Sequence, residues 1–247
     1  MTLTLIAIGA FVATFLGGFL ALRIQDKLHL VLGFSAGAVI GVAFFDLLPE
    51  AINLSTSSGL HDASFATMLM AAGFVVYMIL DRFALSHHSD DHCENEQHLG
   101  PQATRGYLGA GSLSVHSFLD GLGVGLAFQV SPTVGLIVAL AVLAHDFSDG
   151  INTVSLIVKN GGSRASALRW LAIDAVAPVL GIVVSSFFSL SEATLGLALS
   201  VFCGFFLYIG ASELLPESHH NHPTVWTTVA TVLGVVVLWG AVSLAGL

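Results

Sequence analysis

Eight long apolar segments, separated by short polar ones, follow each other along the chain. They cover residues 3–22, 30–48, 65–85, 107–128, 133–158, 168–188, 195–215 and 225–247. A helix needs about 20 apolar residues to cross the hydrocarbon core of a bilayer. The pattern therefore predicts an all-α, polytopic membrane protein with eight transmembrane helices, which form a single domain over residues 1–247.

The basic residues predict the orientation of these spans. All seven lie in or beside the segments that join spans one and two, three and four, and five and six: Arg23, Lys27, Arg82, Arg105, Lys159, Arg164 and Arg169. Because short cytoplasmic loops are enriched in Lys and Arg, we expect this side to be cytoplasmic and both termini to be outside. Positive charge follows the first span rather than preceding it, unlike in a signal peptide, so we expect that span to be retained.

The amino-acid composition supports a membrane location and limits the classes of binding partner. The chain is 55% hydrophobic and only 9% charged, whereas a soluble domain is about 25% charged. The net charge of -9 argues against nucleic acid as a partner and leaves the lipid bilayer as the expected surroundings. The short loops favour a bacterial plasma (inner) membrane. The oligomeric state is not readable from the sequence, and a homodimer stays open.

A short motif occurs twice, at the ends of spans two and seven. The first copy reads Asp46-Leu-Leu-Pro-Glu50 and the second reads Glu213-Leu-Leu-Pro-Glu217. These two spans cross in opposite directions under the expected topology, so the sequence predicts inverted repeats of spans 1–3 and 6–8 around spans 4 and 5. Inverted repeats around a midplane site are typical of secondary transporters. The alternative is that the motif only ends helices, since Pro is a common stop signal.

Spans four and five each carry a His and an Asp four residues apart, which places both side chains on one helix face. The pairs are His116 with Asp120, and His145 with Asp149. Ionisable groups inside a membrane are costly unless they pair, bind an ion or face water. Imidazole nitrogen and carboxylate oxygen suit Zn²⁺, Fe²⁺ and Mn²⁺. The sequence therefore predicts one metal site shared by two helices.

Two further residues lie beside these ligands and could help to form a second site. Ser117 directly follows His116, and Asp146 directly follows His145, each about 100° around its helix. Asp120 and Asp149 would then bridge the two sites. The alternative for any single residue is a buried polar group satisfied by a neighbouring helix.

The two motifs, His116-Ser-Phe-Leu-Asp120-Gly and His145-Asp-Phe-Ser-Asp149-Gly, together with the repeated Leu-Leu-Pro-Glu segments, resemble those of the ZIP (Zrt-, Irt-like protein) family of divalent metal transporters, most of all its bacterial branch. The resemblance covers essentially the whole chain. It implies eight spans with both termini outside, a binuclear metal centre between spans four and five, and import toward the cytoplasm. The ligands it implies are His116, Asp120, His145 and Asp149 for the first metal, and Ser117, Asp120, Asp146 and Asp149 for the second.

The chain departs from the family pattern at four positions. Ser117 stands where relatives often carry Asn, and both bridging carboxylates are Asp rather than Glu. Ala177 precedes Pro178 in span six, where many relatives have Glu. We expect Asp174, one turn earlier, to take the place of that Glu as a metal ligand. The alternative is that Pro178 only kinks the helix.

Acidic and His residues at the ends of spans two and seven predict a path to and from the site. Asp46 and Glu50 lie toward the outer end of span two and are expected to receive the incoming ion. The expected exit residues lie at the inner end of span seven and in the loop after it: Glu213, Glu217, His219, His220 and His222. The alternative for both groups is that they are solvated helix ends.

The longest polar segment, residues 86–105, is rich in His and acidic residues and is expected to be a cytoplasmic loop. Its candidate metal ligands are His87, His88, His92, Cys93 and His98. Short His-rich tracts can bind metal ions, and the alternative is an unstructured polar linker.

Taken together, these features predict an importer of divalent metal ions, with zinc first and iron, manganese or cadmium as other candidates. The metal is then the transported substrate, and we expect no organic cofactor and no enzymatic activity. The alternatives are a membrane-embedded metal-dependent hydrolase, in which the metal activates water, and a passive ion channel. Neither alternative explains the inverted repeats as well.

Overall fold

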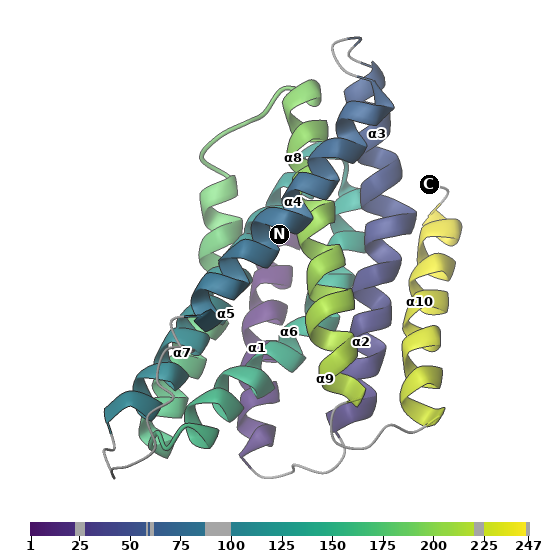
Figure 1. Cartoon of the computed structure of the whole chain (residues 1–247). Coiled ribbons are helices and arrows are strands. Elements are labelled where there is room, and N and C mark those ends of the chain that lie inside the picture. The colour runs from purple at the N-terminus through teal and green to yellow at the C-terminus, as the bar shows by residue number, and fades with distance from the viewer. Residues whose placement is uncertain (23–27, 58, 60–61, 87–99, 220–224, 246–247) are drawn as a thin grey trace.

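The computed structural model describes residues 1–22, 28–57, 59, 62–86, 100–219 and 225–245, and its regular elements are all helical. Eight helical segments are long and apolar enough to cross a membrane (Figure 1). The elements in chain order are α1 (Thr2–Ala21), α2 (Leu28–Val42), η1 (Ala43–Leu47), α3 (Leu48–Ser57), α4 (Ala63–Ser86), α5 (Gly100–Val130), α6 (Pro132–Lys159), α7 (Arg164–Ser185), α8 (Glu192–Tyr208), η2 (Ile209–Leu214), α9 (Leu215–His219) and α10 (Val225–Ala245). The all-α, eight-span prediction is confirmed.

Two boundaries predicted from the sequence are wrong. The second span continues through α3 to Ser57, well beyond its expected end at residue 48. Hydroxyl groups at its end bond to carbonyls of their own helix, as Thr56 Oγ1 does to the Ile52 oxygen at 2.8 Å, so polar composition does not end the helix. In the same way, α5 already begins at Gly100, inside the expected 86–105 loop.

Each copy of the Leu-Leu-Pro-Glu motif begins at the last residue of one turn of π-helix. In η1 the Leu48 amide donates to the Ala43 oxygen, and in η2 the Leu215 amide donates to the Gly210 oxygen. Each π turn lies just before a proline, which can neither donate a backbone hydrogen bond nor fit a regular helix interior. The helix therefore continues past the proline, and the π turns carry Asp46 and Glu213. Such turns occur often at functional sites.

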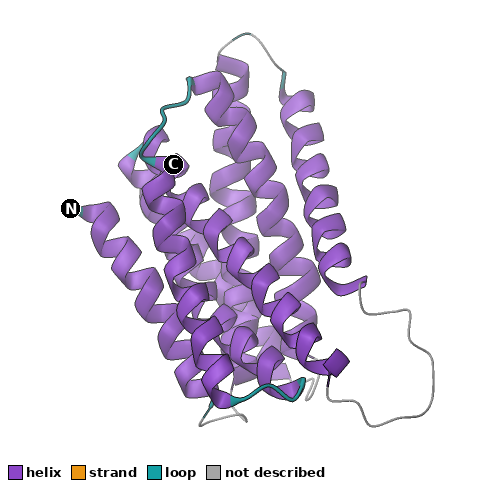
Figure 2. Cartoon of the chain, turned by 90° about the vertical axis from the view of Figure 1, so that its left-hand side faces the viewer, coloured by secondary structure: helices purple, strands orange, loops and turns teal. Residues whose placement is uncertain are grey.

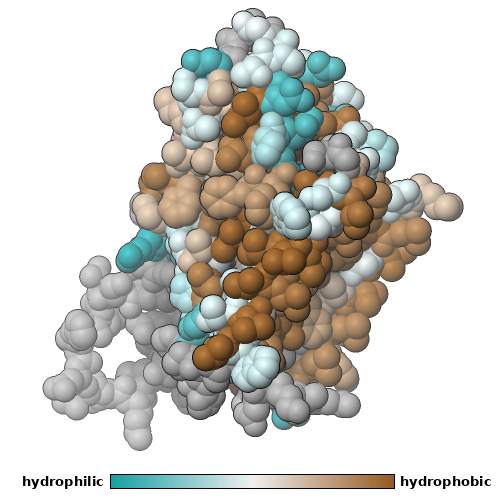
Figure 3. Space-filling view, turned by 90° about the vertical axis from the view of Figure 1, so that its right-hand side faces the viewer, coloured by the Kyte–Doolittle hydropathy of each residue, from teal (hydrophilic) through white to brown (hydrophobic). Residues whose placement is uncertain are grey.

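Consecutive spans run in opposite directions, so Met1 and the end of α10 lie at the same end of the bundle (Figures 1 and 2). Four described basic residues lie near the helix ends at the opposite end: Arg82, Lys159, Arg164 and Arg169. Large apolar side chains are exposed along α10, among them Val232, Val236 and Trp239. Figure 3 shows hydrophobic residues over the middle of one face and hydrophilic ones gathered toward one end. This distribution matches a protein surrounded by lipid.

The spans form two groups of four. Helices α1, α5, α6 and α7 pack chiefly against one another, and the second group consists of the spans formed by α2 with α3, by α4, by α8 with α9, and by α10. Pairs of glycines allow the same close approach in each half. In the first group a Cβ at Gly121 would lie 2.0 Å from the Pro178 oxygen, and one at Gly150 would lie 1.9 Å from the Thr14 oxygen.

Two glycines in the second group of helices also lie very close to a neighbouring backbone. A Cβ at Gly73 would lie 2.4 Å from the Val201 oxygen, and one at Gly234 would lie 2.2 Å from the Phe34 oxygen. Gly73 in the third span thus corresponds to Gly234 in the eighth. Since these spans run in opposite directions, the contacts support the inverted repeats that the sequence predicts.

The glycine contacts lead to a stability prediction for Gly150→Ala. The new Cβ would collide with the Thr14 oxygen, and overpacking of this kind costs about 1–3 kcal/mol. We expect a clearly lower thermal midpoint for the variant purified in detergent. The matched control is Gly240→Ala in α10, because a Cβ there has no atom within 4 Å. Equal midpoints for the two variants would contradict the close helix approach.

Candidate metal centre

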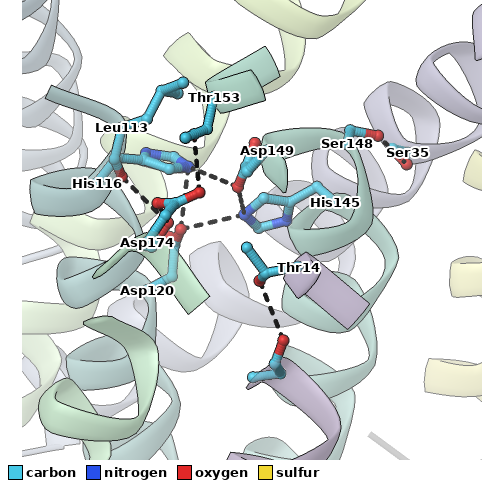
Figure 4. A network of polar contacts seen from close by, with 12 residues as sticks. Thr14, Ser35, Leu113, His116, Asp120, His145, Ser148, Asp149, Thr153 and Asp174 are labelled. Atoms are coloured by element: carbon cyan, nitrogen blue, oxygen red, sulfur yellow. Dashed lines mark hydrogen bonds and ion pairs between the residues drawn. The ribbon is translucent and has the colours of Figure 1, made fainter. Parts of the chain in front are cut away.

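Four of the predicted metal ligands converge between α5 and α6. His116 and Asp120 come from α5, and His145 and Asp149 come from α6, each pair one turn apart on its helix. All four are buried, with exposed fractions of 3% or less. Each offers a ligand atom within 4.8 Å of the other three, and Figure 4 shows their side chains pointing toward one another.

The spacing of the four ligand atoms fits a single small ion. His116 Nε2 lies 3.0 Å from Asp120 Oδ2 and 3.4 Å from Asp149 Oδ2. His145 Nε2 lies 3.2 Å from Asp120 Oδ2 and 3.9 Å from Asp149 Oδ2. Ligands at typical Zn–N and Zn–O distances in a tetrahedron are about 3.4 Å apart. The four side chains therefore suit a tetrahedral zinc site with little rearrangement.

The hydrogen bond of His145 Nδ1 indicates which nitrogen of this ring carries the hydrogen and which one offers a lone pair to the site. Nδ1 lies 2.9 Å from the Ala141 carbonyl oxygen, which can only accept, so Nδ1 carries the hydrogen. The neutral ring then presents the lone pair of Nε2 to Asp120 Oδ2, which is itself rich in electrons. Since two lone pairs repel, a cation or a proton must lie between these atoms.

Asp149 adds a second sign that the site is built for a positive charge. Its Oδ2 atom is buried and has no hydrogen-bond partner. A buried carboxylate oxygen without a partner is costly, and the cost disappears when a cation binds. Both observations therefore point to the same position between the two helices.

The residues predicted for a second site are arranged differently. Asp174 of α7 is buried and accepts two hydrogen bonds, from Ser117 Oγ at 2.9 Å and from Thr153 Oγ1 at 2.8 Å (Figure 4). Asp146 is also buried, and neither of its carboxylate oxygens has a hydrogen-bond partner. Ser117 and Asp174 are thus engaged with each other, and of the three residues Ser117, Asp146 and Asp174 only Asp146 presents carboxylate oxygens without a hydrogen-bond partner.

The predicted path residues lie outside this group of ligands. Asp46 is buried in η1, and its Oδ2 has no hydrogen-bond partner, whereas Glu50, Glu213 and Glu217 are partly buried. His219 is partly buried at the end of α9, where its Nδ1 lies 2.9 Å from the Leu215 oxygen.

The remaining candidates fall outside the described residues. They are His220 and His222 after α9, and the loop residues His87, His88, His92, Cys93 and His98.

Sequence reasoning missed two residues that contact the site. Thr153 bonds Asp174 and lies one turn after Asp149 on the same helix face, so its spacing was a usable signal. Tyr77 of α4 lies with its hydroxyl 2.5 Å from His116 Nδ1. Its span carries no recognisable motif, and only the packing of α4 against the site reveals this contact.

Comparison with known proteins finds one matching family model and several similar proteins. A family model described as ZIP Zinc transporter matches residues 84–247, a range that contains all four ligands of the site. Zinc transporter ZupT of Corynebacterium aurimucosum is 28% identical over 94% of this chain and 92% of its own length. Zinc transporter ZIP9 of Xenopus tropicalis is 27% identical over 92% and 89%, respectively. Zinc transporter ZIP13 of Pongo abelii is 28% identical over 76% of this chain and 57% of its own length.

Proposed function

Because the chain belongs to the ZIP family of zinc transporters, we propose that it imports zinc toward the cytoplasm through the site between α5 and α6. It is a multi-pass membrane protein and a metal transporter rather than an enzyme. The bacterial relative supports a bacterial plasma membrane as its location. The basic residues near the helix ends opposite the termini support an orientation with both termini outside. The metal ion is the cargo of this reaction.

One observation carries the proposal most directly: four buried ligand atoms, two nitrogen and two oxygen, lie within 4.8 Å of one another in the middle of two spans. An ion that loses its water there regains four ligands at once. Nitrogen and oxygen donors favour zinc and also suit iron and manganese, so these ions and cadmium are the competing substrates to test.

The π turns support a stepwise path to and from this site. Asp46 and Glu213 occupy equivalent places in the two halves, in spans that run in opposite directions. The first would receive the ion from outside, with Glu50 beside it, and the second would pass it on toward Glu217 and the His residues that begin at His219. Alternating exposure of the site to the two sides would then complete transport, as inverted repeats allow.

The test of the proposal is metal flux into proteoliposomes that contain the purified protein. We expect saturable zinc flux, and we expect the double variant His145→Ala, Asp149→Ala to lose it, because two of the four ligands are then missing. Fe²⁺, Mn²⁺ and Cd²⁺, offered in separate experiments, give the substrate ranking. Expression in bacteria that lack their own zinc importers tests direction: an importer raises the zinc content of the cells.

Several results would overturn the proposal. Flux that does not saturate would indicate a channel, and equal flux in the double variant would place the path elsewhere in the protein. A fall in cellular zinc on expression would show export rather than import.

A further inference from the structure

The two His ligands occupy equivalent positions but are held in different ways. His145 Nδ1 bonds to the Ala141 oxygen of its own helix. His116 Nδ1 instead contacts the hydroxyl of Tyr77, which comes from α4. The Tyr77 side chain is buried, and its ring meets the His116 ring edge-on with the centroids 5.7 Å apart. One ligand is thus oriented from within its helix and the other from outside it.

The hydrogen bond between Tyr77 and His116 has no counterpart at the equivalent position of the other repeat. Gly73 and Gly234 are equivalent glycines in the third and eighth spans, and Tyr77 and Leu238 each follow four residues later. Leu238 is buried as well, but it cannot form a hydrogen bond. Tyr77 therefore breaks the symmetry between the two halves at the metal ligands themselves.

Tyr77 also belongs to the second group of helices, whereas the four ligands belong to the first. Its ring packs against Phe205 and Tyr208 of α8, with centroid distances of 5.4 and 5.3 Å, so it is held firmly on its own side. The contact between Tyr77 and His116 therefore crosses the boundary between the groups. A movement of one group along the other must break it.

We propose that Tyr77 is a positioning residue, which holds the His116 ring with Nε2 toward the ion and ties the site to the second group of helices. This inference rests on the proposed role of His116 as a ligand. When Nε2 binds the ion, Nδ1 carries the hydrogen and needs an acceptor, as the second nitrogen of metal-bound His almost always does. A tyrosine hydroxyl can accept as well as donate, so Tyr77 can serve both the empty and the loaded site.

The variant Tyr77→Phe tests the proposal, because it removes the hydroxyl and keeps the ring packing. Loss of a group that orients a metal ligand typically weakens metal binding about 10–100-fold, and we expect a loss of zinc affinity in that range for the purified protein in a chelator competition. The matched control is Tyr208→Phe. Its hydroxyl donates to Asp81 Oδ2 at 2.8 Å and touches no ligand, so we expect wild-type affinity.

A second comparison separates positioning from a general structural effect. In a His116→Ala background there is no ring to orient, so adding Tyr77→Phe should cause no further loss. Wild-type affinity in Tyr77→Phe, or an equal loss in the His116→Ala background, would overturn the positioning role alone. If His116→Ala itself bound zinc as tightly as the wild type, the proposed site would fail, and this inference would fail with it.

Discussion

The variant Asp120→Asn is expected to lose more than about 100-fold in zinc affinity, beyond the range typical for groups that only orient a ligand. Asp120 Oδ2 is the atom that faces both His rings, at 3.0 Å from His116 Nε2 and 3.2 Å from His145 Nε2. Asparagine keeps the size of the side chain but removes its charge and one oxygen. The loss therefore reports on the charge and the ligand, with little contribution from packing.

Two measurements test the loss of zinc binding in Asp120→Asn: the zinc affinity, and the stabilisation of the protein by zinc. A ligand at 100 times its dissociation constant stabilises a folded protein by about 2.7 kcal/mol, so the wild type should gain a higher thermal midpoint with zinc, and Asp120→Asn should not gain it at the same concentration. The control with the same chemical change is Glu192→Gln, because Glu192 is exposed at the start of α8. If Asp120→Asn kept both the affinity and the stabilisation, the ion would bind elsewhere.

The fold could be predicted from the sequence because one property dominates it. In lipid every backbone polar group needs an internal partner, so a long apolar segment has to be helical. What the sequence did not reveal is how the helices end. Pro49 and Pro216 read as stop signals, but the π turns before them let both helices continue. The expectation that proline ends a helix fails here because the π-helical hydrogen bonds in the turn before each proline let the helix continue.

The candidate site could be predicted only as far as spacing within one helix determines it. His116 with Asp120, and His145 with Asp149, were visible because a four-residue spacing places both side chains on one face. Tyr77 reaches the site through the packing of α4, and no pattern within its own span gives that direction. Asp174 was predicted as a ligand, but only the structure shows two hydroxyl groups already bonded to it.

This arrangement leads to the last prediction, which concerns Asp146 and Asp174. Both are buried acids, but only the carboxylate of Asp174 has hydrogen-bond partners. A buried polar group without a partner costs about 1–3 kcal/mol, and more if it is charged. We therefore expect Asp146→Asn to raise the thermal midpoint of the metal-free protein. Asp174→Asn should lower it, because one acceptor oxygen replaces two and a hydroxyl loses a bond worth about 1 kcal/mol.

The number of zinc ions bound by the same variants tests the second site. Asp146 does not belong to the group of four ligands within 4.8 Å, and the Asp174 carboxylate already accepts hydrogen bonds from Ser117 and Thr153. We expect one zinc ion per chain in the wild type and in Asp146→Asn, measured by elemental analysis after equilibrium dialysis. Two ions in the wild type and one in Asp146→Asn would show instead that Asp146 holds a second ion.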